Sequence, residues 1–112
     1  MKKAFYITTT LPYVNAKPHI GHAVEFVRAD VLSRYKKKIG FDVFFNIGTD
    51  EHGQKIYESA KEKGLSPQEY VDINSGYFRN LIDILNISSD VHFVRTTDDN
   101  LKLISRISCI CT

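Results

Sequence analysis

PHIGHAVEFVRADVLSRYKKKIGFDVFFNI, residues 18–47, is the stretch that decides the fold. Within it, apolar residues recur at three- and four-residue spacing, and Asp30 and Arg34 can pair across one helical turn. We therefore predict a helix that begins near Pro18, ends at Gly40 and buries one face. That face is expected to contain Val24, Val27, Val31, Tyr35 and Ile39. The next residues, 41–47, form an apolar and aromatic run of strand length.

A further strand is predicted upstream of this helix. Residues 4–10 read AFYITTT, and such a run of aromatic and β-branched residues favours a buried strand. Residues 11–18 contain two prolines and no apolar period, which indicates a loop. Strand, loop, helix and strand in this order predict a parallel βαβ unit. We expect an α/β protein with a partial Rossmann-like nucleotide-binding fold, made of this unit and additional helices.

The second half of the chain predicts two helices and a strand. Residues 54–63 are expected to form a short helix closed by Gly64. The sequence 66–69, SPQE, is a capping box that begins a longer helix. Residues 91–94 favour a strand, and Thr97 could cap a last helix. The buried face of the longer helix is expected to contain Tyr70, Asn74, Tyr77, Leu81 and Leu85.

The composition is that of an ordinary globular protein. Of the 112 residues, 43% are hydrophobic and 25% are charged, and the formal net charge of +2 is too small to indicate nucleic acid binding by itself. The N-terminal region has no apolar run suited to a signal peptide or a membrane span, so we expect a cytoplasmic protein without a membrane partner. Cys109 and Cys111 are poorly spaced for a mutual disulfide and too few for a zinc site.

The first candidate motif is His19-Ile20-Gly21-His22, at the predicted start of a helix. Free backbone N–H groups and the positive end of the helix dipole attract phosphate there. Two imidazoles three residues apart add hydrogen-bond donors, and Gly21 leaves room for a purine ring against the backbone. These features indicate a nucleotide site. The alternative is that both histidines merely cap the helix or lie on the surface.

The second candidate motif is Gly-Thr-Asp-Glu-His-Gly, residues 48–53, just beyond the second strand. Ligands bind at this edge of open parallel sheets. The acidic pair Asp50 and Glu51 could receive an ammonium group or a ribose hydroxyl, and the flanking glycines permit close approach. An ordinary polar turn that leads into the next helix is the alternative interpretation.

Together these motifs resemble the catalytic domain of class I aminoacyl-tRNA synthetases, and of the methionyl-tRNA synthetases in particular. The resemblance runs from about Phe5 to Thr97. It includes residues 8–15, TTTLPYVN, with the His-Ile-Gly-His motif, then residues 28–35, RADVLSRY, and residues 48–56, GTDEHGQKI. It implies that residues 1–97 are the N-terminal part of such a catalytic domain and that residues 98–112 are a divergent or truncated tail.

The resemblance also implies which residues bind ATP. His19 and His22 would contact the phosphates and stabilise the charge that develops on the α-phosphate, which makes them the candidate catalytic residues. Gly21 would lie under adenine, and Pro18 would belong to the same site. Glu25, one turn beyond His22, is a further candidate for a ribose or solvent contact. ATP is the expected substrate, accompanied by magnesium.

The same resemblance implies a site for methionine. Asp50 would receive the α-ammonium group, while Leu11 and Tyr13 would line the pocket for the side chain. Because a thioether is a weak hydrogen-bond acceptor, selection would rest on apolar shape with a tyrosine hydroxyl nearby.

Several family features have no counterpart in these 112 residues: the lysine-bearing second signature, the insertion with its zinc knuckle, and the anticodon-binding domain. We therefore expect an incomplete enzyme that is inactive alone, contains no zinc site, and meets tRNA only through regions missing from this chain. Two alternatives stay open. The chain could be a non-catalytic nucleotide-binding or interaction fragment, or a small protein similar to nucleotidylyltransferases.

Overall fold

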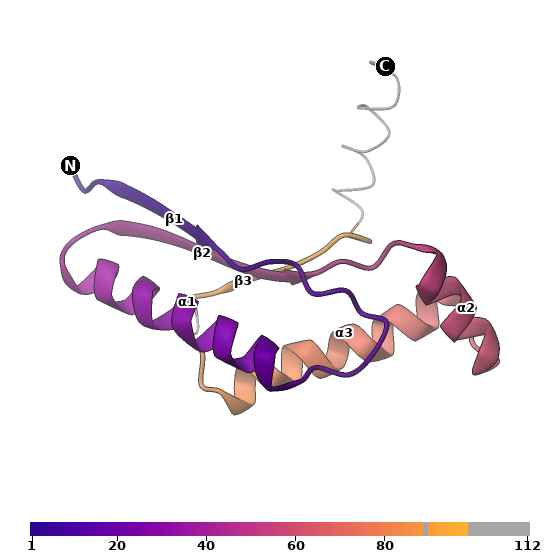
Figure 1. Ribbon diagram of the computed structural model, residues 1–112. Coiled ribbons are helices and arrows are strands. Elements are labelled where there is room, and N and C mark those ends of the chain that lie inside the picture. Colours follow the sequence, from indigo (N-terminus) through magenta and orange to yellow (C-terminus); the bar gives the residue numbers. More distant parts are fainter. Residues whose placement is uncertain (89, 99–112) are drawn as a thin grey trace, which may run out of the picture.

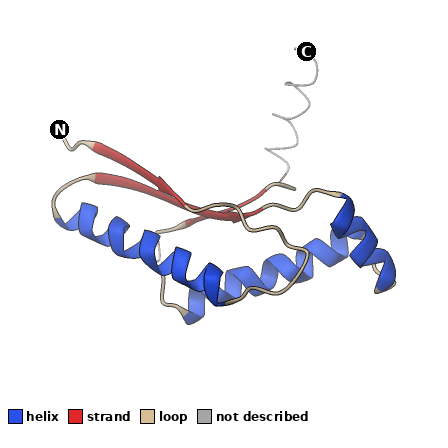
Figure 2. Ribbon diagram, in the orientation of Figure 1, coloured by secondary structure: helices blue, strands red, loops and turns tan. Residues whose placement is uncertain are grey.

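The computed structural model describes residues 1–88 and 90–98, which form a parallel sheet with helices on one face (Figures 1 and 2). The strands pair in the order β1-β2-β3, and both pairings are parallel. The described elements are β1 (Ala4–Thr8), α1 (Ile20–Lys38), β2 (Asp42–Thr49), α2 (Gln54–Glu62), α3 (Pro67–Ile84) and β3 (His92–Arg95). The predicted α/β class and parallel βαβ unit are confirmed.

The predicted tail, 98–112, lies outside the described residues except for Asp98. The same holds for the helix expected after Thr97 and for both cysteines. Within the described part of the chain, no helix combines the length and hydrophobicity that a bilayer crossing requires.

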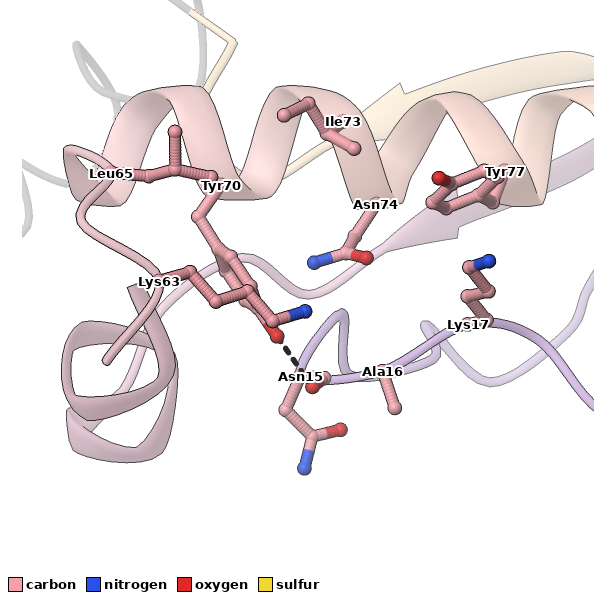
Figure 3. Close-up of a pocket in the computed structure, with 9 residues that line it drawn as sticks. All are labelled: Asn15, Ala16, Lys17, Lys63, Leu65, Tyr70, Ile73, Asn74 and Tyr77. Carbon is pink, nitrogen blue, oxygen red and sulfur yellow. Dashed lines mark hydrogen bonds between the residues drawn. The ribbon is translucent and has the colours of Figure 1, made fainter. Parts of the chain in front are cut away.

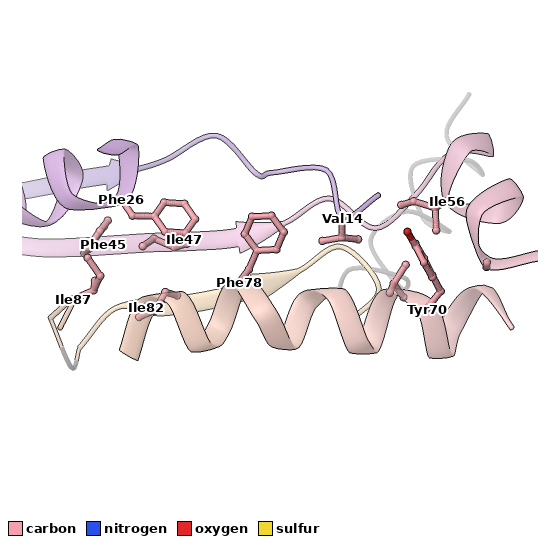
Figure 4. Close-up of a cluster of buried hydrophobic side chains, with 11 residues drawn as sticks. Val14, Phe26, Phe45, Ile47, Ile56, Tyr70, Phe78, Ile82 and Ile87 are labelled. Atoms are coloured by element: carbon pink, nitrogen blue, oxygen red, sulfur yellow. The ribbon is translucent and has the colours of Figure 1, made fainter. Parts of the chain in front are cut away.

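The hydrophobic core lies between the sheet and the helices (Figure 4). Its three largest fully buried side chains are Phe26 from α1, Phe45 from β2 and Phe78 from α3. Ile47 of β2 and Val14 of the β1–α1 loop are also fully buried. Burying a side chain of this size contributes roughly 1.5–3 kcal/mol. These contacts fix α1 and α3 against the sheet and so determine where the loops at its edge lie.

The predicted buried face of α1 is wrong. Its buried residues are Ala23, Phe26, Asp30 and Ser33. The five residues expected to be buried are exposed by 39–61%: Val24, Val27, Val31, Tyr35 and Ile39. The true face is displaced by one residue, or about 100° around the helix. Asp30 lies at the centre of the true buried face, and a pattern based on apolar residues does not detect a face with a polar residue at its centre.

Asp30 is buried because its carboxylate is fully engaged. The backbone N–H and hydroxyl of Ser88 donate to Oδ1 at 3.0 and 2.6 Å, and Arg34 Nε donates to Oδ2 at 2.8 Å. Burial alone would raise the pKa of Asp30, but the hydrogen bonds from Ser88 and Arg34 outweigh it and lower the pKa. The predicted Asp30–Arg34 pair is thus confirmed, and it also joins α1 to the loop after α3.

Helix α2 begins and ends close to the predicted positions, and α3 begins where predicted. Helix α2 ends before Gly64, whose φ of 68° suits glycine. Helix α3 begins with the predicted capping box, in which Glu69 N–H donates to Ser66 Oγ at 3.2 Å and Ser66 N–H donates to Glu69 Oε2 at 2.9 Å.

The buried face of α3 is only partly as predicted. Tyr70 and Asn74 are buried, but Tyr77 is 38% exposed and Leu81 and Leu85 are half-buried. The remaining buried positions are Val71, Ser75, Phe78 and Ile82. The face turns toward Phe78 because this ring packs into the core beneath the sheet.

Candidate active site

The segment after β1 runs beside the end of β2. Asp50 N–H donates to the Pro12 carbonyl at 2.8 Å, and Val14 N–H donates to the Asp50 carbonyl at 3.2 Å. These bonds form a parallel bridge between Tyr13 and Asp50. The predicted methionine-site residues Tyr13 and Asp50, far apart in sequence, are therefore neighbours at the edge where the strands end.

Two glycines allow the side chains of this segment to approach the turn. A Cβ on Gly48 would lie 2.8 Å from Leu11 Cδ2 and 2.2 Å from the Val94 carbonyl oxygen. Gly53 has a φ of 136°, and a Cβ there would lie 1.9 Å from the Tyr13 hydroxyl. Leu11 and Tyr13 thus lie over the two glycines that flank the acidic turn, because no side chain is there to exclude them.

The two carboxylates of that turn have different surroundings. Asp50 is half-buried, and its Oδ1 accepts only a long hydrogen bond, 3.3 Å, from the His52 N–H. It forms no ion pair with a cation among residues 1–88 and 90–98. Asp50 therefore retains acceptor capacity for a ligand.

Glu51, by contrast, is taken up by the protein. Its side chain is fully buried, and Arg95 donates to it from Nε at 2.9 Å and from Nη2 at 2.7 Å. The Thr97 hydroxyl adds a hydrogen bond of 2.6 Å. Arg95 also pairs with Asp72 of α3. The hydrogen bond that Arg95 donates to Glu51 is the main reason that the pKa of Arg95 rises above its ordinary value.

This network joins β3, the acidic turn and α3, and the sequence analysis missed it. A sequence-based signal existed in principle, because Arg95 follows an apolar strand and can be matched to the acidic turn once β3 is placed beside β2. The ligand role predicted for the acidic pair therefore has only Asp50 available.

His19 and His22 form a reciprocal cap at the start of α1. Gly21 N–H donates to His19 Nδ1 at 3.0 Å, and His19 N–H donates to His22 Nδ1 at 3.1 Å. The ring centroids lie 3.9 Å apart. Because each Nδ1 accepts a hydrogen bond, each neutral ring carries its proton on Nε2. The backbone N–H groups of Gly21, His22 and Ala23 are taken up by His19, so the two Nε2–H groups are the donors that this capped helix start presents.

His22 is held in its neutral form. Burial is the main cause that lowers its pKa, and the neighbouring His19 lowers it further, while Glu25 has the opposite effect. The ring of buried Phe78 meets His22 edge to face, with 5.1 Å between centroids and 76° between planes. In this form the His22 ring can donate one N–H hydrogen bond to a phosphate without carrying a positive charge.

Glu25 connects the two groups of candidate residues. The backbone N–H and the hydroxyl of Thr10 donate to Glu25 Oε1 at 2.7 and 2.8 Å. Thr10 directly precedes Leu11, so Glu25 ties the segment that bears Leu11 to the helix that bears His22. The sequence analysis did not foresee this bond. A ribose contact of Glu25 stays a prediction and would use acceptor positions that Thr10 leaves free.

The described residues contain no group of three or more His, Cys, Asp or Glu side chains arranged to hold a metal ion.

The candidate site consists of two parts at one sheet edge. One part has neutral imidazole donors at a helix start, and the other has a carboxylate beside Leu11 and Tyr13. Such a pair can bind a ligand that carries a phosphate and an ammonium group.

Comparison with known proteins gives consistent relatives. The chain is 49% identical over 102 residues to the methionine--tRNA ligase of Rickettsia felis, covering 91% of this chain and 20% of that protein. It is 53% identical over 98 residues to the methionine--tRNA ligase of Caldanaerobacter subterraneus, covering 88% of this chain and 15% of that protein. The chain thus spans about a fifth or less of the length of these relatives.

A solved structure shares the fold of this chain. The Mycobacterium tuberculosis methionyl-tRNA synthetase in complex with methionyl-adenylate superposes with a TM-score of 0.84 at 42% identity. The match covers 88% of this chain and 19% of that one. The sequence model of the family described as tRNA synthetases class I (M) matches residues 5–108. The chain therefore belongs to the family of class I tRNA synthetases (M).

Proposed function

We propose that this chain provides part of the site at which methionine is activated by ATP, before its attachment to tRNA. In the reaction, a carboxylate oxygen of methionine bonds to the α-phosphorus of ATP. The bond from that phosphorus to the bridging oxygen breaks, and pyrophosphate leaves with the electron pair. The observation that carries the proposal is the pairing of neutral imidazoles at the start of α1 with Asp50 at the same sheet edge.

His19 and His22 are proposed to act on the ATP phosphates. Their Nε2–H groups would donate to oxygens of the α-phosphate, where negative charge grows as the carboxylate attacks. Because the Nδ1 atoms are engaged by backbone N–H groups, the rings do not need to reorient during the reaction. Gly21 and Pro18 are proposed to border the adenine and ribose, since they flank the same helix start.

Asp50 is proposed to receive the ammonium group of methionine. Its free acceptor capacity and its bridge to Tyr13 support this role. Leu11 and Tyr13 would then line the side-chain pocket, an apolar surface with a hydroxyl group. An unbranched thioether side chain fits such a surface by shape and polarisability.

Further parts of the proposal rest on the family. Magnesium would accompany the ATP phosphates as part of the substrate. Transfer of the methionyl group to tRNA, and the cytoplasmic location in which we expect it, also belong to the proposal and are not assigned to residues described here.

Calorimetry on the 112-residue chain tests the proposal. ATP and methionine are titrated separately and then together, with leucine as the control amino acid. We expect methionine, but not leucine, to change the affinity for ATP, because the two ligands would meet at one sheet edge. ATP binding that is indifferent to methionine would instead support a nucleotidylyltransferase-like protein. Binding of neither ligand by a folded chain would support the non-catalytic alternative.

A further inference from the structure

One cavity is lined by residues other than those proposed to bind ATP and methionine. It has a volume of ≈ 370 Å³ and lies between the loop at residues 15–17 and helix α3 (Figure 3). The Tyr70 hydroxyl donates to the Asn15 carbonyl at 2.7 Å. This hydrogen bond connects the loop and α3, the two elements that form opposite walls of the cavity.

The cavity carries uncompensated positive charge. Two lysines line it, Lys17 from the loop and Lys63 from the end of α2, and its lining contains no Asp or Glu. Lys17 Nζ lies 4.9 Å from the centre of the Tyr77 ring, and Lys63 Nζ lies 5.2 Å from the centre of the Tyr70 ring. Neither lysine forms an ion pair with a carboxylate in the described part of the chain. Each ammonium therefore retains donors for a ligand.

The cavity also contains a buried amide with an unused donor. Asn74 is 5% exposed, and its Nδ2 has no hydrogen-bond partner among the described residues. Figure 3 shows the Asn74 amide directed from α3 toward the 15–17 loop, between Tyr70 and Lys17. Buried amide donors are normally paired, because an unpaired one loses its hydrogen bonds to water without replacement. A ligand acceptor in this cavity would supply the missing partner.

We propose that this cavity binds a phosphate group. Two ammonium groups and an amide N–H offer donors from three directions, and phosphate has the charge and the number of oxygens to accept from all of them. Asn74 lines the cavity with its unpaired Nδ2 and so supplies the third donor. The phosphate comes either from a free anion, such as inorganic phosphate or pyrophosphate, or from the backbone of an RNA strand. The proposal does not depend on the reaction proposed above.

The test uses ¹⁵N-labelled 112-residue protein and three probes: pyrophosphate, inorganic phosphate, and a short single-stranded RNA. We expect saturable shifts of the Asn74 side-chain amide and of backbone signals at residues 15–17 with at least one probe. Saturation by the free anions without competition from RNA identifies a free-anion site. Displacement of pyrophosphate by RNA identifies a backbone-phosphate site.

Three variants separate a built site from general surface charge. Lys17→Met and Lys63→Met keep the apolar stems but remove the charges, and each should weaken binding by about tenfold or more. Asn74→Leu removes the unpaired amide and should weaken binding without unfolding the chain. Lys61→Met, in the last turn of α2 two residues before Lys63 but outside the cavity lining, is the matched control and should leave affinity within about twofold.

The proposal is overturned if no probe gives saturable shifts at the cavity. It is also overturned if Lys61→Met weakens binding as much as Lys63→Met. The two lysine variants decide the matter should Asn74→Leu fail to fold.

Discussion

Replacing His19 by Asn separates two roles that the structure gives to one side chain. His19 Nδ1 accepts the Gly21 N–H at 3.0 Å and so caps α1. An Asn side-chain oxygen can accept the same N–H, since Asn is among the preferred capping residues. The Asn amide N–H groups are attached at Cγ and do not reach the position of the imidazole Nε2–H that we propose for the α-phosphate. His19→Asn therefore preserves the cap and removes the donor, whereas His19→Ala removes both.

The expected magnitudes differ between the two variants. Loss of the cap in His19→Ala should cost about 1 kcal/mol of the free energy of unfolding, which lowers Tm by roughly 4–8 °C. For His19→Asn the loss should stay below about 0.5 kcal/mol. Both variants lose a donor to the transition state, worth about 3–4 kcal/mol, so adenylate formation should slow by about a hundredfold or more.

Two assays check these values. Thermal unfolding of the 112-residue chain reports the cap. Methionine-dependent exchange of pyrophosphate into ATP, in a full-length methionine--tRNA ligase that carries this segment, reports the chemistry. If His19→Asn keeps its exchange rate within about threefold of the parent, the imidazole is only a cap and the phosphate role is refuted.

Other changes have equally definite consequences. In a binding titration, Asp50→Asn should weaken methionine affinity by about tenfold to a hundredfold, because the ammonium loses its charged partner; unchanged affinity would assign the turn another role. Glu51→Gln should lower the free energy of unfolding in urea by about 2 kcal/mol, because half-buried Arg95 loses one of its two carboxylate partners, while Glu62→Gln, at the exposed end of α2, should change it little. Because the pKa of His22 is lowered in the folded chain from 6.5, only the unfolded state gains the proton at first as the pH falls below about 6.5, so Tm should decrease. His22→Gln, which can keep the capping box, should show a smaller decrease between pH 7.5 and 5.5, and an equal one would mean that other groups control it.

The order and type of the elements could be predicted because they depend on local patterns. The capping box at residues 66–69 and the glycine after α2 follow from neighbouring residues alone. So does the strand predicted at residues 4–10, which the structure has at residues 4–8, although it is not buried as predicted. The orientation of α1 could not be predicted in this way. Asp30 lies on the buried face of α1 because it is hydrogen-bonded to Ser88. In the sequence, Ser88 follows two further helices, α2 and α3.

The candidate site shows the same division. The motif at residues 19–22 indicated a helix start with two imidazoles, and the structure confirms that start. The tautomers of the rings depend on backbone geometry that a sequence does not display. Glu51 is hydrogen-bonded to Arg95, which is 44 residues away in the sequence. The sequence of the turn alone therefore does not distinguish the roles of Asp50 and Glu51.

The central claim is that one sheet edge holds the ammonium of methionine at Asp50 and the α-phosphate at His19 and His22. A crystal structure of the chain with a non-hydrolysable methionyl-adenylate analogue tests it most directly. The account predicts an Asp50 carboxylate oxygen about 3 Å from the analogue's ammonium nitrogen, and at least one histidine Nε2 about 3 Å from the group that replaces the phosphate. An analogue bound with its ammonium away from Asp50, or with both imidazoles out of reach of that group, would contradict the account.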